Sequence, residues 1–256
     1  MYTMQRIEGI VYNQQYPKEC LIDLWLPETD KAVPLFIYFH GGGLESGKRT
    51  DAMLQDMVTH YGIAVATADY RMYPTAKYPD FLEDAAACVR FMKDYKDAAF
   101  SGIFVGGSSA GGYISTMLCF APQFLAEVGM KPTDVAGYVH DAGQPTVHFN
   151  VLRERGMDPR SIRVDEACPI YYADHTPNPE DVPPMIFFYA DNDMPCRPEQ
   201  TEMFYATMKY FRYPMEKIHI KRFDGFNHCG YNFAPNAEGI NILAAESAAF
   251  ILKYTK

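Results

Sequence analysis

Gly107-Ser108-Ser109-Ala110-Gly111-Gly112 is the stretch that decides how this chain is interpreted, because it contains the pattern G-x-S-x-G centred on Ser109. The pattern alone also fits a glycine-rich turn. Here it follows an apolar run at residues 103–105 and precedes a helical run at residues 113–120. Such a tight strand-to-helix turn projects its central side chain away from the sheet, at a helix start that favours developing negative charge. The context therefore predicts Ser109 as a nucleophile, with Ser108 pointing the other way in a structural role.

The rest of the chain alternates short apolar runs with helical periodicities. The runs at residues 35–39, 64–68, 103–105 and 185–189 have the length and composition of strands that are covered on both faces. Apolar residues recur at i, i+3, i+4 and i+7 from Leu54 and Ala85, and a similar helical spacing starts at Phe204. This alternation predicts an α/β fold with a mostly parallel, doubly wound sheet and helices on both faces. The stretch 21–26 alternates more and is expected to be an antiparallel edge strand.

One irregular, proline-rich segment interrupts this rhythm. It covers about residues 143–182, and structureless stretches of that length are usually functional loops or lids. We expect residues 1–256 to form a single domain, with this segment as a cap or lid inserted over the carboxyl edge of the sheet.

Composition excludes several classes of partner. A formal net charge of −9 and a pI near 5.2 argue against nucleic acid and anionic membrane surfaces as partners. The six cysteines are scattered, which favours buried free thiols, and we expect no metal and no cofactor. The chain shows neither a signal peptide nor an apolar run of about 18 residues, so a cytoplasmic protein without membrane attachment is expected. Formation of a homodimer stays open.

A second glycine motif, His40-Gly41-Gly42-Gly43, directly follows the apolar run 35–39. Acyl transfer builds an oxyanion, and preorganised backbone N–H groups stabilise it. Consecutive glycines allow the N–H groups of Gly42 and Gly43 to turn toward one point, and the N–H of Ala110 completes the predicted oxyanion hole. His40 itself is expected to anchor this loop.

The general base must be a histidine whose pKa lies near the working pH. If the order is Ser, Asp, His along the chain, only His219 and His228 remain. His219 lies within a predicted strand, whereas His228 lies in a glycine-bracketed loop after it, which favours His228. The acid should follow the run 185–189, where Asp191 and Asp193 are both available and spacing alone does not choose between them.

Together these motifs resemble the hormone-sensitive-lipase-like esterases and related bacterial carbohydrate esterases (acetyl and feruloyl esterases) of the α/β-hydrolase fold. The resemblance covers most of the chain, including Asp69-Tyr70-Arg71, which in that family is structural. The family's acid stands seven residues before a glutamine, and Asp193 stands so before Gln200, which favours Asp193 over Asp191. Two departures are visible: a helical N-terminal cap is missing or minimal, and the acid loop starts Tyr189-Ala190 where relatives have His-Gly.

The resulting hypothesis is a serine carboxylesterase with the triad Ser109, His228 and Asp193. Its expected substrates are small molecules or saccharides carrying short acyl esters, with Phe149 and the pair Tyr171-Tyr172 available as aromatic surfaces for a sugar. Two alternatives remain: an arylformamidase or other amidase of the same fold, and an inactive hydrolase fold serving as a binding module. Retention of both Ser109 and His228 disfavours the second alternative.

Overall fold

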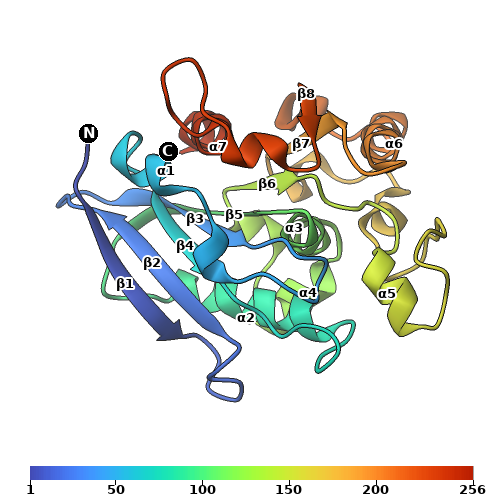
Figure 1. Cartoon of the computed structure of the whole chain (residues 1–256), viewed down its shortest axis with the longest axis horizontal. Helices are drawn as coiled ribbons and strands as arrows, with labels where there is room; N and C mark the ends of the chain where they lie inside the picture. Colours follow the sequence, from blue (N-terminus) through green and yellow to red (C-terminus); the bar gives the residue numbers. More distant parts are fainter. Residues whose placement is uncertain (256) are drawn as a thin grey trace.

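An eight-stranded sheet organises residues 1–255, the part of the chain that the computed structural model describes (Figure 1). Its strand order is β1-β2-β4-β3-β5-β6-β7-β8, and every neighbouring pair from β4 to β8 is parallel. The strands are β1 (Met4–Val11), β2 (Leu21–Pro27), β3 (Val33–Phe39), β4 (Ala64–Ala68), β5 (Phe100–Ser108), β6 (Gly137–Asp141), β7 (Met185–Asn192) and β8 (Ile218–Asn227). The predicted mostly parallel sheet is confirmed.

The antiparallel edge of the sheet differs from the expectation. β2 is antiparallel to β4, as its alternating pattern indicates, but it is not the edge, because β1 pairs with its other side. β1 was missed because its residues are mixed polar and apolar, and none of its side chains is fully buried. An edge strand with one neighbour and a solvent-facing side needs no apolar run.

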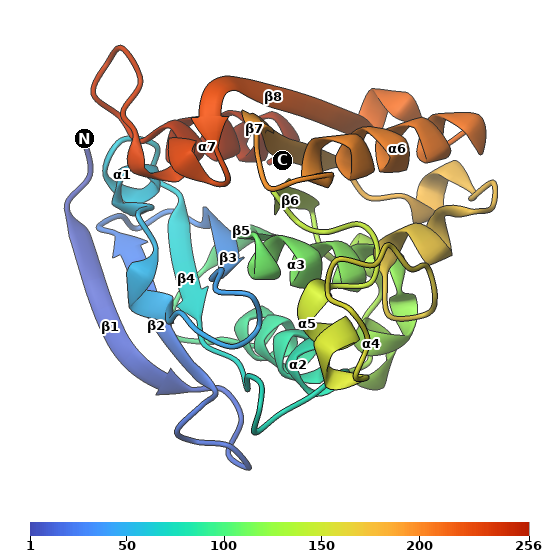
Figure 2. The same ribbon diagram turned by 45° about the vertical axis from the view of Figure 1, so that its right-hand side comes forward.

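Residues 1–255 form seven α-helices, six of which cover the two faces of the sheet. They are α1 (Gln55–Thr59), α2 (Asp80–Lys93), α3 (Ala110–Phe120), α4 (Pro122–Glu127), α5 (Phe149–Glu154), α6 (Arg197–Tyr210) and α7 (Ile242–Tyr254). Helices α1 and α7 pack on one face, and α2, α3, α4 and α6 on the other (Figures 1 and 2). None of the helices within residues 1–255 is both long enough and apolar enough to cross a bilayer.

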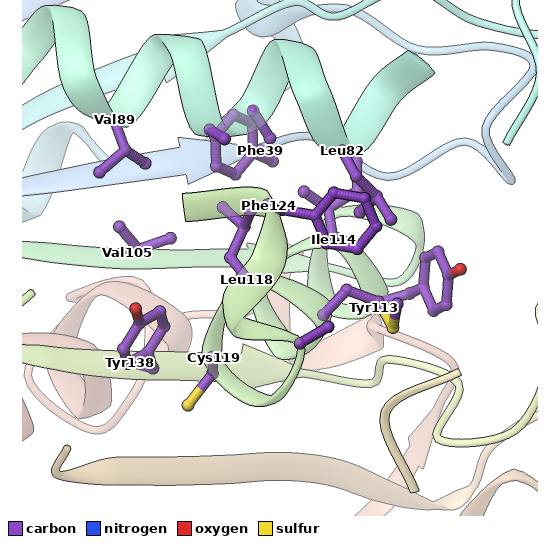
Figure 3. Packing of buried hydrophobic residues seen from close by; sticks show 14 of the residues in the cluster. Phe39, Leu82, Val89, Val105, Tyr113, Ile114, Leu118, Cys119, Phe124 and Tyr138 are labelled. Atoms are coloured by element: carbon purple, nitrogen blue, oxygen red, sulfur yellow. The ribbon is translucent and has the colours of Figure 1, made fainter. Parts of the chain in front are cut away.

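The larger core cluster lies between the sheet and helices α2 and α3 (Figure 3). Phe39 and Val105 from the strands meet Leu82, Val89 and Ile114 from the helices, and all five side chains are fully buried. Each contributes about 1.5–3 kcal/mol by leaving water. Every residue of α3 is buried, so the helix is enclosed on all sides. The residue that precedes α3, Ser109, therefore sits on a rigid base.

The insertion at residues 143–182 contains α5 and two short 3-10 helices, Pro169–Ala173 and Pro179–Asp181. The two halves of the insertion lie in different parts of the structure. The ring of Phe149, at the start of α5, lies against Gly43 at the carboxyl end of β3. Tyr172, in the second half, lines a cavity of about 430 Å³ together with Cys119, near the far end of α3. Only the first half therefore borders the carboxyl edge around Ser109.

Candidate active site

Ser109 occupies a strained turn between β5 and α3. Its φ and ψ are 56° and −111°, in a region that costs a residue with a side chain about 1–3 kcal/mol. The surrounding structure holds it there: its N–H donates to the backbone oxygen of Asp141 at 2.8 Å. Gly111 permits the close approach of neighbouring backbone, because a Cβ at that position would lie 1.9 Å from the oxygen of Phe39. This geometry agrees with the predicted nucleophile elbow.

His228 follows β8 directly and reaches Ser109. Its Nε2 lies 2.8 Å from Ser109 Oγ, and its Nδ1 lies 2.5 Å from Oδ1 of Asp193. The Asp193 side chain is fully buried, and the same oxygen accepts the N–H of Met194 at 2.6 Å. Asp191 is exposed and instead accepts the N–H of Gly225 at 2.8 Å, which joins the carboxyl-terminal parts of β7 and β8. The structure thus brings Asp193, rather than Asp191, to the histidine.

Two other histidines take no part in the hydrogen bonds between Ser109, His228 and Asp193. His219 lies within β8, with Nε2 2.9 Å from the hydroxyl of Tyr254. His40 stacks on Tyr70 at a centroid distance of 4.5 Å, and its Nδ1 donates to the oxygen of Gly41 at 2.6 Å. The Tyr70 hydroxyl donates to the backbone oxygen of His40 at 2.9 Å. Burial lowers the pKa of His40, so this ring is a neutral anchor of its loop.

The glycine loop after β3 lies against the elbow. A Cβ on Gly41 would be 3.3 Å from Cβ of Ser109. None of the hydrogen bonds formed among residues 1–255 uses the N–H of Gly42, Gly43 or Ala110. These three groups, the predicted oxyanion donors, therefore keep their N–H available beside Ser109. Gly43 differs from Gly42 in its surroundings, because the ring of Phe149 lies over it.

A cavity of about 450 Å³ opens onto Ser109 and His228. Phe233 at its edge is 73% exposed, and the sequence analysis missed it. It lies five residues beyond His228, at the end of the short 3-10 helix Gly230–Phe233, which carries no motif; the nearby aromatic residues Tyr231 and Phe233 were the only signal. The other lining residues are Tyr38, His40, Gly41, Gly42, Ser46, Gly47, Asp51, Ala52, Ser108, Cys229 and Asn232.

Helix α5 of the insertion is fastened to the glycine loop. Glu45, two residues after Gly43, forms an ion pair with Arg153 at 2.5 Å and accepts a hydrogen bond from Asn150 at 3.2 Å. Phe149 also lines a second cavity, of about 460 Å³, whose walls include Ile162, Met194 and Pro195. This cavity lies between the insertion and the segment that follows Asp193.

The aromatic pair expected to serve a sugar lies away from this region. Tyr172 lines the cavity near the carboxyl end of α3, its hydroxyl donates to the oxygen of Glu166, and Tyr171 packs edge-on against it. Tyr172 thus borders a different cavity from the one that opens onto Ser109, because the second half of the insertion runs back toward the start of β7. Within residues 1–255, no group of three His, Cys, Asp or Glu side chains is placed to hold a metal ion.

Comparison with known proteins agrees with this architecture. Residues 36–141 match the model of the alpha/beta hydrolase fold family. Carboxylic ester hydrolase LipN of Mycobacterium tuberculosis is 31% identical over 115 residues, which is 43% of this chain and 31% of LipN. The 3-O-acetylpapaveroxine carboxylesterase CXE2 of Papaver somniferum is 31% identical over 43% of this chain and 40% of its own length. The chain thus spans well under half the length of these relatives.

Solved structures match over nearly the whole chain. A truncated carbohydrate esterase from gut microbiota superposes with a TM-score of 0.79, covering 99% of this chain and 97% of its own, at 16% identity. An esterase from Pyrobaculum calidifontis gives 0.73, covering 100% and 87%, at 20% identity.

The sheet topology, the elbow, the family match over residues 36–141 and the solved structures together show that the chain has the α/β hydrolase fold. More particularly, the resemblance to the hormone-sensitive-lipase-like esterases is confirmed.

Proposed function

We propose that the chain is a serine carboxylesterase for short-chain acyl esters, with Ser109 as nucleophile, His228 as general base and Asp193 as the orienting acid. The observation that carries this proposal is the unbroken chain of hydrogen bonds from the Ser109 hydroxyl through the His228 ring to the buried Asp193 carboxylate. The esterase names of the relatives support the same reaction class.

The geometry suggests how the reaction proceeds. The Ser109 hydroxyl attacks the ester carbonyl while its proton moves to Nε2 of His228, 2.8 Å away. The imidazolium then protonates the departing alcohol, leaving an acyl group on Ser109. A water molecule, deprotonated by His228, hydrolyses this acyl-enzyme. Asp193 holds the proton of His228 on Nδ1, so that Nε2 is free to accept.

The negative charge that develops on the carbonyl oxygen requires donors. Ala110 is the first residue of α3, and the N–H groups of Gly42 and Gly43 have no acceptor among residues 1–255. We assign these three N–H groups to the oxyanion hole. In a site shielded from water, one such donor contributes about 2.7–4 kcal/mol to the transition state.

The cavity that opens onto Ser109 and the separate cavity lined by Phe149 support a division of the substrate. The cavity at Phe233 is bordered by polar groups such as Ser46, Asp51 and Asn232, which suits a polar alcohol, including a saccharide stacked on the exposed ring. The cavity at Phe149 is lined by apolar side chains, among them Ile162 and Met194, and also by Arg153, Arg160 and Arg197; its apolar part suits the acyl chain. The carbohydrate esterase among the structural matches supports a saccharide ester as substrate.

The test is hydrolysis of p-nitrophenyl esters from acetate to palmitate, beside acetylated xylan, feruloyl esters and N-formylkynurenine. Acetate and butyrate esters should be hydrolysed fastest, and Ser109→Ala should abolish the activity. Preference for N-formylkynurenine over every ester would instead identify an arylformamidase.

A further inference from the structure

Asp141, the last residue of β6, is a buried carboxylate beside the nucleophile, and it has no part in the reaction proposed for this site. β6 runs parallel to β5, so that Asp141 lies opposite Ser108 in the sheet register. The residue is only 1% exposed, and its backbone oxygen accepts the N–H of Ser109 at 2.8 Å. One end of Asp141 is therefore already bonded to the elbow.

Neutral donors satisfy the Asp141 side chain. The hydroxyls of Ser108 and Tyr231 donate to its two oxygens, and Nδ2 of Asn232 donates to Oδ2 at 2.9 Å. Asn232 also donates to Oγ of Ser108 at 2.9 Å, which closes a small network. No Lys, Arg or His of residues 1–255 forms an ion pair with this carboxylate. A buried carboxylate is costly unless donors surround it, and here they do.

Two of these donors belong to the loop that carries His228. Tyr231 and Asn232 lie in the short 3-10 helix Gly230–Phe233, which starts just after the histidine. Cys229, which lies between His228 and this helix, has a φ of 55°, so the chain turns sharply there. The N–H of Asn232 donates back to the oxygen of Cys229 at 3.0 Å. The hydrogen bonds from this helix to Asp141 therefore fix the position of the segment that directly follows His228.

We propose that Asp141 is a positioning residue that aligns Ser109 with His228. Its backbone oxygen holds the nucleophile, and its carboxylate holds the loop after the base through Tyr231 and Asn232. Asp193 binds the histidine from the loop after β7, and Asp141 supplies the second attachment, from the neighbouring strand. The inference rests on the proposed function, because it assumes that Ser109 and His228 act together.

The test is Asp141→Asn, which keeps the size of the side chain but presents an amide N–H₂ to groups that donate. We expect kcat to fall by up to about 100-fold through misalignment, with KM unchanged because Asp141 does not touch the substrate. The matched control is Asp84→Asn in α2. Asp84 is another carboxylate that is 1% exposed, but it pairs with Arg71 at 2.8 Å, outside the site. This control should lower Tm and leave kcat unchanged.

A second variant covers the case in which Asp141→Asn does not fold. Tyr231→Phe removes one donor to Asp141 and keeps the ring that packs on Phe223 at a centroid distance of 4.1 Å. We expect it to lower kcat about threefold to tenfold, the value of one hydrogen bond, again with KM unchanged.

A fluorophosphonate probe separates failure of this inference from failure of the proposed esterase function. The rate at which the probe labels Ser109 reports its activation without any ester substrate, and it should fall in both variants. If the wild-type protein labels but hydrolyses no ester, the labelling rates still decide the role of Asp141. Folded Asp141→Asn and Tyr231→Phe that label at the wild-type rate, or that change KM alone, would overturn it.

Discussion

The hydroxyl oxygen of Ser109 lies 2.8 Å from Nε2 of His228, although 119 residues separate the two along the chain. Ser109 directly follows the central strand β5, and His228 directly follows β8, the last strand of the sheet. Their meeting depends on the parallel arrangement of β5 through β8, whose carboxyl ends share one edge.

Ser109 should be the covalent centre. A fluorophosphonate should add one adduct per chain, because among residues 1–255 His228 bonds the hydroxyl of Ser109 and of no other serine. Ser108, its neighbour, is buried and bonded to Asp141. Intact-mass and peptide mass spectrometry should locate the adduct on Ser109. Ser109→Ala should remove both labelling and ester hydrolysis, whereas Ser108→Ala should still give the adduct on Ser109, at a lower rate because Ser108 donates to Asp141. Labelling of Ser109→Ala at the wild-type rate contradicts the assignment.

The two carboxylates of the acid loop should differ sharply. Asp193→Asn should lower kcat by about 10⁴-fold, because the amide favours the wrong tautomer of His228. Asp191→Asn should change kcat little, since Asp191 is exposed and bonds only the amide groups of Asn192 and Gly225. Steady-state kinetics on p-nitrophenyl acetate measures both. The reverse order of effects would show that Asp191 replaces Asp193 at the histidine in solution.

Phe149 should limit the length of the acyl chain. Its ring lies over Gly43 and lines the cavity of about 460 Å³. An acyl chain attached to Ser109 must therefore pass this ring in order to extend into that cavity. Phe149→Ala should move the preference from acetate and butyrate toward hexanoate and octanoate, while the probe still labels Ser109. Tyr171→Ala, in the other half of the insertion, is the control without this shift. An unchanged chain-length profile in Phe149→Ala would make the first half of the insertion purely structural.

Phe233 should matter for the alcohol half of the substrate. Phe233→Ala should raise KM for acetylated xylan, because a stacking surface at the cavity edge is lost, and should leave KM for p-nitrophenyl butyrate nearly unchanged. The kcat/KM ratio between the two substrates is the measurement. Emulsified long-chain triglycerides should be poor substrates, without interfacial activation. Strong activity on them contradicts the proposed preference for polar alcohols.

Stability should fall on mild acidification because of a buried histidine. Burial lowers the pKa of His140 to about 3, whereas an unfolded histidine has a pKa of about 6.5. At a pH between these two pKa values, the unfolded chain binds a proton at His140 that the native protein does not bind. The free energy of unfolding therefore falls as the pH decreases. The slope is up to about 1.4 kcal/mol per pH unit for this group.

Urea unfolding between pH 7.5 and pH 5 measures this loss. His140→Gln, which keeps a partner for Ser115, should lose stability less steeply over the same range. His148 is also buried with a lowered pKa, so the variant should retain part of the slope. Equal slopes for wild type and His140→Gln would contradict the role of this ring.

The sequence by itself determined the elements whose geometry is local. The elbow at Ser109, the glycine loop after β3 and the apolar central strands each depend on residues adjacent in the chain. Glycine spacing, apolar runs and helical periodicity record such local requirements directly. The α/β hydrolase fold and the resemblance to esterases could therefore be predicted from the sequence alone.

Only the tertiary structure decided which side chains complete the site. The run 185–189 is followed by both Asp191 and Asp193, and only the family resemblance favoured Asp193; the bend at the end of β7 places Asp193 against His228 and leaves Asp191 in solvent. Asp141 and Phe233 carry no motif, because their surroundings come from strands and loops distant in sequence. The physical reason is that sheet register and loop packing, set by the whole core, fix such long-range contacts.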